Sequence, residues 1–281
     1  MAIPWFSRLR LVSRLSQPPS KPRPGRGRKG GGKSNAGGQG GGKANGLTST
    51  LAVQDFATGT STGAQSFTTT AMGGLTPKAA IVLGSYWQIG DTAERAPANA
   101  SLGFIDGSSQ LSITGYSGNA VASTNNRKQS STSSALVLGR STIEKDASGS
   151  LTTDGISLNF SSNGVASMGC HFAAFGGNGV SAKVGTISLG TGTIAIDVTG
   201  VGFEPDVVLI ISVDGSFSPT YTTANWKFMF GICANDGSAT QRAVAFYEDD
   251  GQANGDANLA LITDGAVTDH NPTTRAEQYS C

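Results

Sequence analysis

The sequence predicts an all-β fold: two tandem β-sandwich domains of jelly-roll-like character, which follow a disordered, basic, Gly-rich N-terminal arm. Three observations support this prediction. The 281 residues include 40 Gly and only 14% charged residues, a composition that favours turns and short strands over long helices. Short apolar runs alternate with turn residues along most of the chain. One block of sequence also recurs, in the same order, in the second half.

The repeat divides the body into a first copy at 51–178 and a second copy at 181–281. The segment GGLTPKAAIVLGS at 73–85 recurs as VGFEPDVVLIISV at 201–213. Each contains a continuous apolar run, which is typical of a buried strand. A Pro precedes each run, and Pro suits a strand entry because it has no N–H to donate. We therefore expect one buried strand to begin near each Pro.

Five residues define the repeat structurally. Gly74 and Pro77 of the first copy correspond to Gly202 and Pro205 of the second, and Phe203 takes the place of a Leu. Further along, the dipeptides at 106–107 and 236–237 are both Asp-Gly, which is a strong hairpin signal.

The second copy is incomplete in this alignment. ALVL at 135–138 aligns with LALI at 259–262, but no counterpart of DGISLNF (154–160) or CHFAAF (170–175) follows. We expect the second copy to lack about two strands. Such a loss leaves an open sheet edge, which a neighbouring subunit, or chain beyond residue 281 if the sequence is a fragment, is expected to cover.

The arm is basic and the body is acidic. Residues 1–50 contain ten Lys or Arg and no Asp or Glu, so 51–281 hold the other ten of the 20 basic residues with all 19 acidic ones, a net charge of −9. Residues 1–20 fit an amphipathic anchor peptide, since a helix there aligns several apolar side chains. The expected partner-docking residues are Trp5, Phe6, Leu9 and Val12. A phosphate-rich surface or a targeting role remains an alternative for this segment.

Residues 21–50 fit a basic Gly-rich tether, because they offer few apolar groups to offset the entropy of ordering Gly. Its cations are candidates for contact with nucleic acid or phosphate. These candidates are Arg23, Arg26, Arg28, Lys29 and Lys33. Since residues 21–46 contain no aromatic residue on which bases stack, a solvated linker is the competing interpretation.

The repeated pattern resembles the tandem β-domain structural proteins of tailed bacteriophages: fibre, decoration and tail accessory proteins. The resemblance rests on the two G-[FL]-x-P blocks, the two Asp-Gly turns and the DGISLNF strand, and it covers about 53–270. The first copy departs from the pattern with Leu75 in place of an aromatic residue, and the second lacks the closing strand. The resemblance implies a virion component without catalytic residues.

Residues that support chemistry are sparse. The chain has two His and three Cys, with no CxxC, HExxH or GxSxG motif, so the sequence indicates neither an enzyme nor a cofactor. One oxygen-rich loop is a weak calcium candidate, through Asp249, Asp250 and Asp256. Its spacing does not match an EF-hand, which favours a solvated hairpin loop instead.

The sequence therefore predicts a non-enzymatic bacteriophage virion protein, located in the virion as a capsid decoration, fibre or tail accessory component. Its expected partners are other virion proteins, bound through the arm, and further copies of itself in a homo-oligomer. One alternative is a small-virus coat protein whose basic arm binds the genome. Another is a glycan-binding module, for which the aromatic candidates are Tyr86, Trp87, Tyr116, Trp226 and Tyr247. No apolar stretch reaches the roughly 20 residues of a membrane span.

Overall fold

The computed structural model describes most of the body and one short N-terminal segment. The described residues are 2–6, 49–89, 98–118, 125–140, 142–164, 166–188, 199–213, 222–223, 225–234, 240–248, 251, 257–263, 268–270 and 277–280. For 2–6, 188, 213, 222–223, 226, 257–258, 268–270 and 277–280 the description covers the backbone alone.

Nearly all of the described secondary structure is β-strand, so the predicted all-β class is confirmed. The first copy contains one short 3-10 turn, η1 (Thr70–Met72), and ten strands: β2 (Thr50–Ala57), β3 (Gly63–Thr68), β4 (Pro77–Gly84), β5 (Ala98–Ile105), β6 (Gln110–Ser117), β7 (Asn126–Ser131), β8 (Leu136–Gly139), β9 (Ile143–Thr152), β10 (Gly155–Asn163) and β11 (Gly169–Gly176). The second copy contributes β12 (Val184–Ser188), β13 (Val207–Val213), β14 (Thr222–Thr223), β15 (Trp226–Ala234), β16 (Thr240–Glu248), β17 (Ala257–Ile262), β18 (Thr268–His270) and β19 (Glu277–Ser280). One further strand, β1, is Ala2–Phe6.

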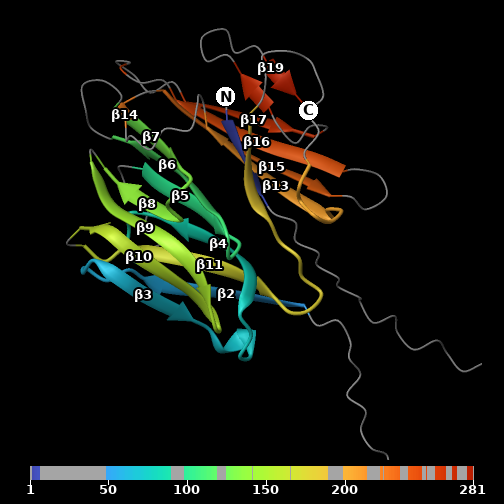
Figure 1. The fold of residues 1–281 in the computed structure, drawn as a ribbon. Helices are drawn as coiled ribbons and strands as arrows, with labels where there is room; N and C mark the ends of the chain where they lie inside the picture. Colours follow the sequence, from blue (N-terminus) through green and yellow to red (C-terminus); the bar gives the residue numbers. More distant parts are fainter. Residues whose placement is uncertain are drawn as a thin grey trace, which may run out of the picture.

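Three antiparallel sheets make up the body (Figure 1). We call them the central sheet (β14-β7-β6-β5-β4-β11-β2), the small sheet (β3-β10-β9-β8) and the outer sheet (β12-β1-β13-β15-β16-β17). The central and small sheets form the sandwich of the first copy, and buried apolar residues from both fill the space between them. This core includes Val82, Leu136, Ile156, Phe160 and Phe172. β18 and β19 form a separate two-stranded ribbon.

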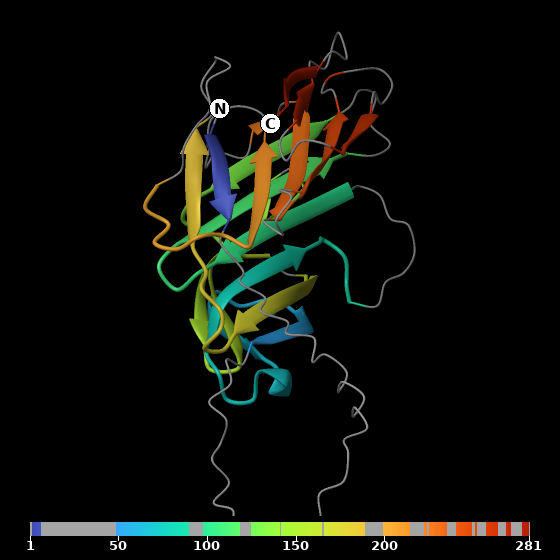
Figure 2. The ribbon, with the colours of Figure 1, turned by 90° about the vertical axis from the view of Figure 1, so that its right-hand side faces the viewer.

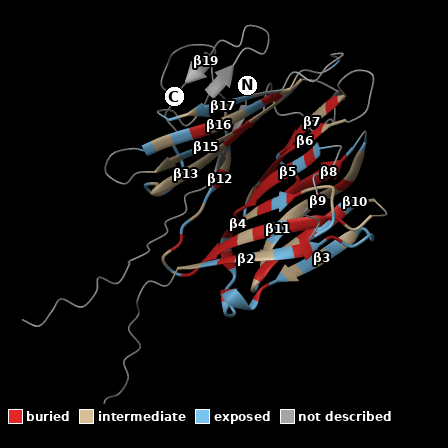
Figure 3. Cartoon of the chain, turned by 180° about the vertical axis from the view of Figure 1, so that it is seen from behind, coloured by how far each residue is buried: buried red, intermediate tan, exposed pale blue. Residues whose placement is uncertain are grey.

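The outer sheet packs on the other face of the central sheet. Leu102, Phe104 and Ile113 of the central sheet meet Val184 and Ile211 of the outer sheet in a second buried cluster. Figure 2 shows the orange strands of the outer sheet in front of the green strands of the central sheet. Figure 3 shows that buried residues concentrate in the strands of the first copy. The two copies therefore share an apolar interface instead of standing apart as separate bodies.

In both copies, the Gly of the G-[FL]-x-P block has a left-handed backbone conformation. Gly74 has φ 85° and Gly202 has φ 83°, a left-handed conformation that Gly adopts without steric cost. In the first copy, Asp154 Oδ1 accepts a hydrogen bond of 2.6 Å from the Gly74 N–H, and the Asp154 N–H donates to the Leu75 carbonyl at 2.9 Å. β4 begins at Pro77, as expected from its missing N–H. Hydrogen bonds in both directions thus connect the G-[FL]-x-P block of the first copy with the Asp154-Gly155 turn.

Six strands of the two copies correspond in sheet position. The order β7-β6-β5-β4-β11-β2 in the central sheet matches β17-β16-β15-β13-β1-β12 in the outer sheet, with every pair antiparallel. The register agrees as well: Val82 pairs with Gly103, and the repeat-related Ile210 pairs with Gly231. The alignment of ALVL with LALI was wrong, because LALI lies in β17, the positional equivalent of β7. β8, which holds most of ALVL, and β17 are both short and apolar, so only their positions in the sheets distinguish them.

The expectation of a helix across residues 1–20 is wrong at its start, because residues 2–6 form β1 instead. A helix satisfies its backbone groups internally, whereas β1 satisfies them by pairing with β12 and β13. Leu9 and Val12 lie outside the described residues.

Gly103 provides a test of the sandwich packing. A Cβ at this position would meet the Ala135 carbonyl oxygen at 1.8 Å, and a backbone atom cannot move aside as a flexible side chain can. We expect Gly103→Ala to lower the free energy of unfolding by about 1–3 kcal/mol or more, as overpacking of a core does. Urea denaturation followed by circular dichroism measures the change.

The matched control is Gly118→Ala, where an added Cβ meets its nearest neighbours at 3.4–3.5 Å, an ordinary contact. Its unfolding midpoint should stay close to that of the unmodified chain. Equal destabilisation by the two substitutions would contradict the close approach of β5 to the segment before β8.

Candidate functional site

The candidate site is a slot in the outer sheet between β12 and β13, and β1 lies in it. β1 pairs antiparallel with β12 from Ala2↔Ser188 to Phe6↔Val184. On its other side, β1 pairs antiparallel with β13 at Trp5↔Ile210 and Phe6↔Leu209. Figure 2 shows the blue β1 between the gold β12 and the orange β13. The N-terminus is thus built into the sheet of the second copy.

The same slot in the first copy holds β11. There, Phe172 pairs with Gln54 of β2 and with Val82 of β4. Aligning FATG at 56–59 with ISLG at 187–190 makes Gly185 the repeat equivalent of Gln54, as Ile210 is of Val82. Trp5 pairs with Gly185 and with Ile210. Both neighbours therefore give the same register, in which Trp5 occupies the position of Phe172. β1 therefore takes the sheet position that the CHFAAF strand β11 takes in the first copy.

β12 depends on β1 for its place in the sheet. Among the described strands, β1 is the sheet partner of β12, and β13 lies on the far side of β1. Without β1, the backbone N–H and C=O groups of β12 and of one side of β13 have no strand to pair with. Open strand edges of this kind readily pair with a further extended segment, so the slot favours a strand such as β1. The covering of the predicted edge therefore comes from the chain's own N-terminus.

A buried carboxylate joins the start of β12 to the first copy. Asp106 Oδ1 accepts hydrogen bonds from the N–H groups of Ser108 (2.8 Å) and Ser109 (2.7 Å) and so closes the predicted β5–β6 hairpin. Asp106 Oδ2 accepts a bond of 2.6 Å from the Val184 N–H, and Lys183 Nζ lies 4.0 Å away. The Asp106-Gly107 turn therefore closes the β5–β6 hairpin and also binds the start of β12 in the second copy. The matching turn at 236–237 lies outside the described residues.

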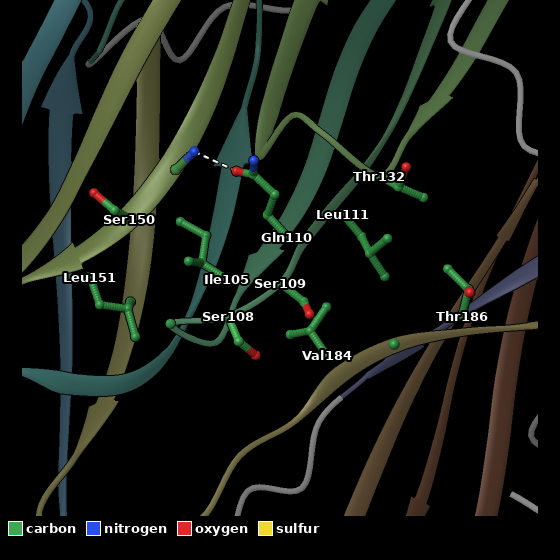
Figure 4. Close-up of a pocket in the computed structure, with 13 residues that line it drawn as sticks. Ile105, Ser108, Ser109, Gln110, Leu111, Thr132, Ser150, Leu151, Val184 and Thr186 are labelled. Carbon is green, nitrogen blue, oxygen red and sulfur yellow. Dashed lines mark hydrogen bonds between the residues drawn. The ribbon is translucent and has the colours of Figure 1, made fainter. Parts of the chain in front are cut away.

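A pocket of about 490 Å³ lies beside this junction (Figure 4). The hairpin, β9 and the start of β12 line it, with Gln110 and Ser109 among the polar residues and Leu111 and Leu151 among the apolar ones. Gln110 is held in place, because its Nε2 donates to the Ser133 carbonyl at 2.6 Å and its Oε1 accepts from the Gly149 N–H. The described lining consists of Ser, Thr, Gln, Gly and apolar residues, and it comes from both copies.

Cys170 and Lys145 are buried in the first sandwich. Burial raises the pKa of the Cys170 thiol to about 12, and the positive charge of Lys145 offsets this only in part. Burial also lowers the pKa of Lys145, against the attraction of Cys170 and Glu144. Lys145 Nζ donates to the Gly59 carbonyl at 2.9 Å and to Asn163 Oδ1. Cys170 belongs to the apolar core of the first sandwich, and a buried neutral thiol is a poor nucleophile.

The aromatic residues proposed for glycan stacking do not form one platform. Tyr116 and Tyr247 are buried, at 8% and 7% exposure, which contradicts their proposed role as stacking faces. Tyr86 packs edge-on against Trp87, donates to Glu144 Oε2 at 2.9 Å and lies under the Arg140 guanidinium. These contacts hold Tyr86 in a structural cluster. The side chain of Trp226 lies outside the description.

The remaining predicted site residues fall into two groups. The arm cations Arg23, Arg26, Arg28, Lys29 and Lys33 and the calcium candidates Asp249, Asp250 and Asp256 lie outside the described residues. Within the described ranges, no three His, Cys, Asp or Glu side chains gather closely enough to hold a metal ion. His171 lies on the exposed face of β11, with its Nδ1 2.8 Å from Asp55 Oδ1.

Two edge strands expose apolar side chains. Leu259 and Leu261 on β17, at the edge of the outer sheet, are 65% and 72% exposed, and Phe246 lies beside them on β16. Leu51 and Val53 on β2, at the edge of the central sheet, are also exposed. Sequence patterns did not single out these residues, since exposure depends on which sheet face is covered. Exposed apolar patches on edge strands are typical of surfaces that contact other proteins.

No protein-family model, curated protein or solved structure matches this chain. Among the described residues, no helix is long and apolar enough to cross a membrane.

The slot generates a direct test by hydrogen exchange. A variant that lacks residues 2–6 should lose protection at the backbone amides of 184–188 and 207–213, because these strands face the emptied slot. We expect exchange at least about tenfold faster there, measured by mass spectrometry of the full chain.

The control variant lacks residues 38–42, which shortens the arm by the same five residues and leaves β1 in place. Its exchange in 184–188 should match that of the full chain. Unchanged protection in the variant without 2–6 would show that β1 does not pair with β12.

The burial of Cys170 makes a second prediction. The thiol should resist alkylation at pH 8.5 in the folded protein and react in urea, because its raised pKa keeps it neutral and burial excludes the reagent. Above about pH 9 the Cys170 thiol ionises in the unfolded chain but stays neutral in the core until about pH 12. The contribution of the thiol to the free energy of unfolding is therefore fully present below about pH 9 and falls progressively between pH 9 and 12. The stability of the unmodified chain relative to Cys170→Ala should therefore fall above pH 9, by up to about 1.4 kcal/mol per pH unit.

Denaturation at a series of pH values checks this slope. The half-buried Cys233 serves as the internal comparison for labelling. Rapid labelling of Cys170 in the folded chain would contradict its placement in the core.

Proposed function

We propose that this chain is a non-enzymatic structural protein of a bacteriophage particle: a capsid decoration, fibre or tail accessory component that assembles with other virion proteins. The observation that carries the proposal is the completion of the outer sheet by the N-terminal strand β1. Addition of an extended segment to a sheet is a common way for proteins to bind one another, since backbone hydrogen bonds supply the affinity. A chain whose fold already includes such an addition is suited to assembly.

Two further observations support an assembling protein. The exposed apolar residues Leu259, Leu261 and Phe246 lie together on the margin of the outer sheet, where a neighbouring protein would remove them from water. The arm carries ten positive charges and the body a net charge of −9, so contacts between the arm of one protein and an acidic body are favoured electrostatically. The bacteriophage assignment itself rests on the resemblance of the repeated sequence blocks.

The basic arm also supports a second candidate, a small-virus coat protein that binds its genome. Ten cations without a single anion in residues 1–50 suit contact with phosphates. In that case the chain itself forms the shell. The stoichiometry of the particle distinguishes the two candidates.

Mass spectrometry of purified particles of the virus that encodes the chain tests the proposal. We expect peptides from the body in intact particles, in a copy number below that of the main shell protein. The control is a mock purification from uninfected host cells, which should contain no such peptides. Absence of the chain from particles would refute the proposal, and its presence as the main shell protein would favour the coat-protein alternative.

A further inference from the structure

We propose that β1 of one copy of this chain inserts into the slot between β12 and β13 of a second copy, so that strand exchange links the chains. The partner is thus a second copy of the same protein, and the interacting segment is Ala2–Phe6. The inference rests on the outer sheet and on the covalent connection of β1. It holds whether or not the chain is a virion component.

The slot accepts an antiparallel strand with a defined register. β12 and β13 stand in the same relation to β1 as β2 and β4 to β11, and the register positions agree on both sides. Nothing in these pairings depends on the strand belonging to the same chain. An identical segment from a second copy makes the same backbone hydrogen bonds.

The covalent connection distinguishes the two slots. Only residues 164–168 separate β10 from β11, so the first slot is filled from within the same copy. In contrast, the 42 residues 7–48 separate β1 from the next described segment. The fully extended length of 42 residues is about 140–150 Å. The covalent connection therefore permits β1 to lie in the slot of a neighbouring copy as well as in its own.

Whether β1 occupies the slot of its own chain or that of a neighbouring copy depends on the effective concentration of each strand at that slot. Because the contacts are the same, the tethered strand and a strand from another copy differ mainly in their effective concentration, which is on the order of mM for a flexible tether. Copies held side by side in an assembly reach comparable local concentrations. The opposite charges of arm and body also act between copies, which favours an arm that lies across an acidic neighbour.

The geometry also predicts the kind of assembly. The donor is the N-terminal strand and the acceptor is the outer sheet, so the two sides of the contact are different surfaces. Contacts between different surfaces close into rings or extend into filaments, unless two chains exchange strands reciprocally. The exposed margin at Leu259 and Leu261 lies on the same sheet and is available for contacts between linked copies.

Position-specific disulfide trapping tests the exchange. One chain carries Ala2→Cys and a second, differently tagged chain carries Ser188→Cys, since Ala2 and Ser188 are register partners and both are small. Paired residues across antiparallel strands have Cα atoms about 4.5–5.5 Å apart, within disulfide range. Both chains also carry Cys233→Ser and Cys281→Ser, while the buried Cys170 is retained. The two chains are co-expressed and oxidised gently after purification.

The expected result is a disulfide-linked pair that carries both tags, with peptides containing positions 2 and 188 joined. The matched control pairs Ala2→Cys with Thr263→Cys, an exposed position just after β17 at the other edge of the outer sheet. The register pair should give at least about tenfold more linked product than this control. A second register pair, Ile3→Cys with Ile187→Cys, should reproduce the result even if one substitution disturbs folding.

A single chain that carries both Ala2→Cys and Ser188→Cys separates the outcomes. If it forms only an internal disulfide while the mixed pairs give no more product than the control, β1 stays in its own chain and the proposal is overturned. If neither the single chain nor the mixed pairs form the disulfide, β1 occupies no slot and the proposal is equally overturned. Neither result bears on whether the chain is found in virus particles.

Discussion

The backbone groups that face the slot between β12 and β13 pair with the strand that lies in it, and the place of β12 in the outer sheet depends on this pairing. In an antiparallel sheet, an interior strand supplies hydrogen bonds to both neighbours. Removing it separates those neighbours and exposes two rows of N–H and C=O groups. The first copy meets the requirement with β11, which follows β10 directly. The second copy meets it with β1, from the opposite end of the chain.

The two Asp-Gly motifs of the first copy have different structural tasks. Asp154 stabilises the turn at Gly74 and so orients β4 within its own sandwich. Asp106 closes a hairpin and accepts the Val184 N–H, which connects the first copy to β12. Since β12 is also the strand that β1 pairs with, the buried carboxylate and the N-terminal strand hold the same element from two directions. β12 is therefore held by polar contacts with the first copy at its start and by backbone pairing with β1 along its length.

These features suit a protein that assembles. Its described chemistry consists of packing and backbone pairing: the nucleophile in the core, Cys170, is buried and protonated, and the pocket at the junction has no charged side chain. In contrast, the acceptor slot, the exposed apolar margins and the charge difference between arm and body are all suited to contacts with other chains. The proposed strand exchange would use the same backbone pairing that β1 makes within its own chain.

The sequence by itself determined the β class, the repeat and its turns, because these depend on local chemistry. The positive φ of Gly74 and Gly202, the start of β4 at Pro77 and the hairpin at Asp106 all follow from the conformational preferences of Gly, Pro and Asp. The sequence also indicated that the second copy lacks its closing strands. Only the tertiary structure decided what fills the gap, because Ala2–Phe6 is apolar enough for a helix face or a strand, and pairing with β12 and β13 selects the strand. Pairing between segments that are distant in sequence depends on the register of whole sheets, which no local pattern encodes.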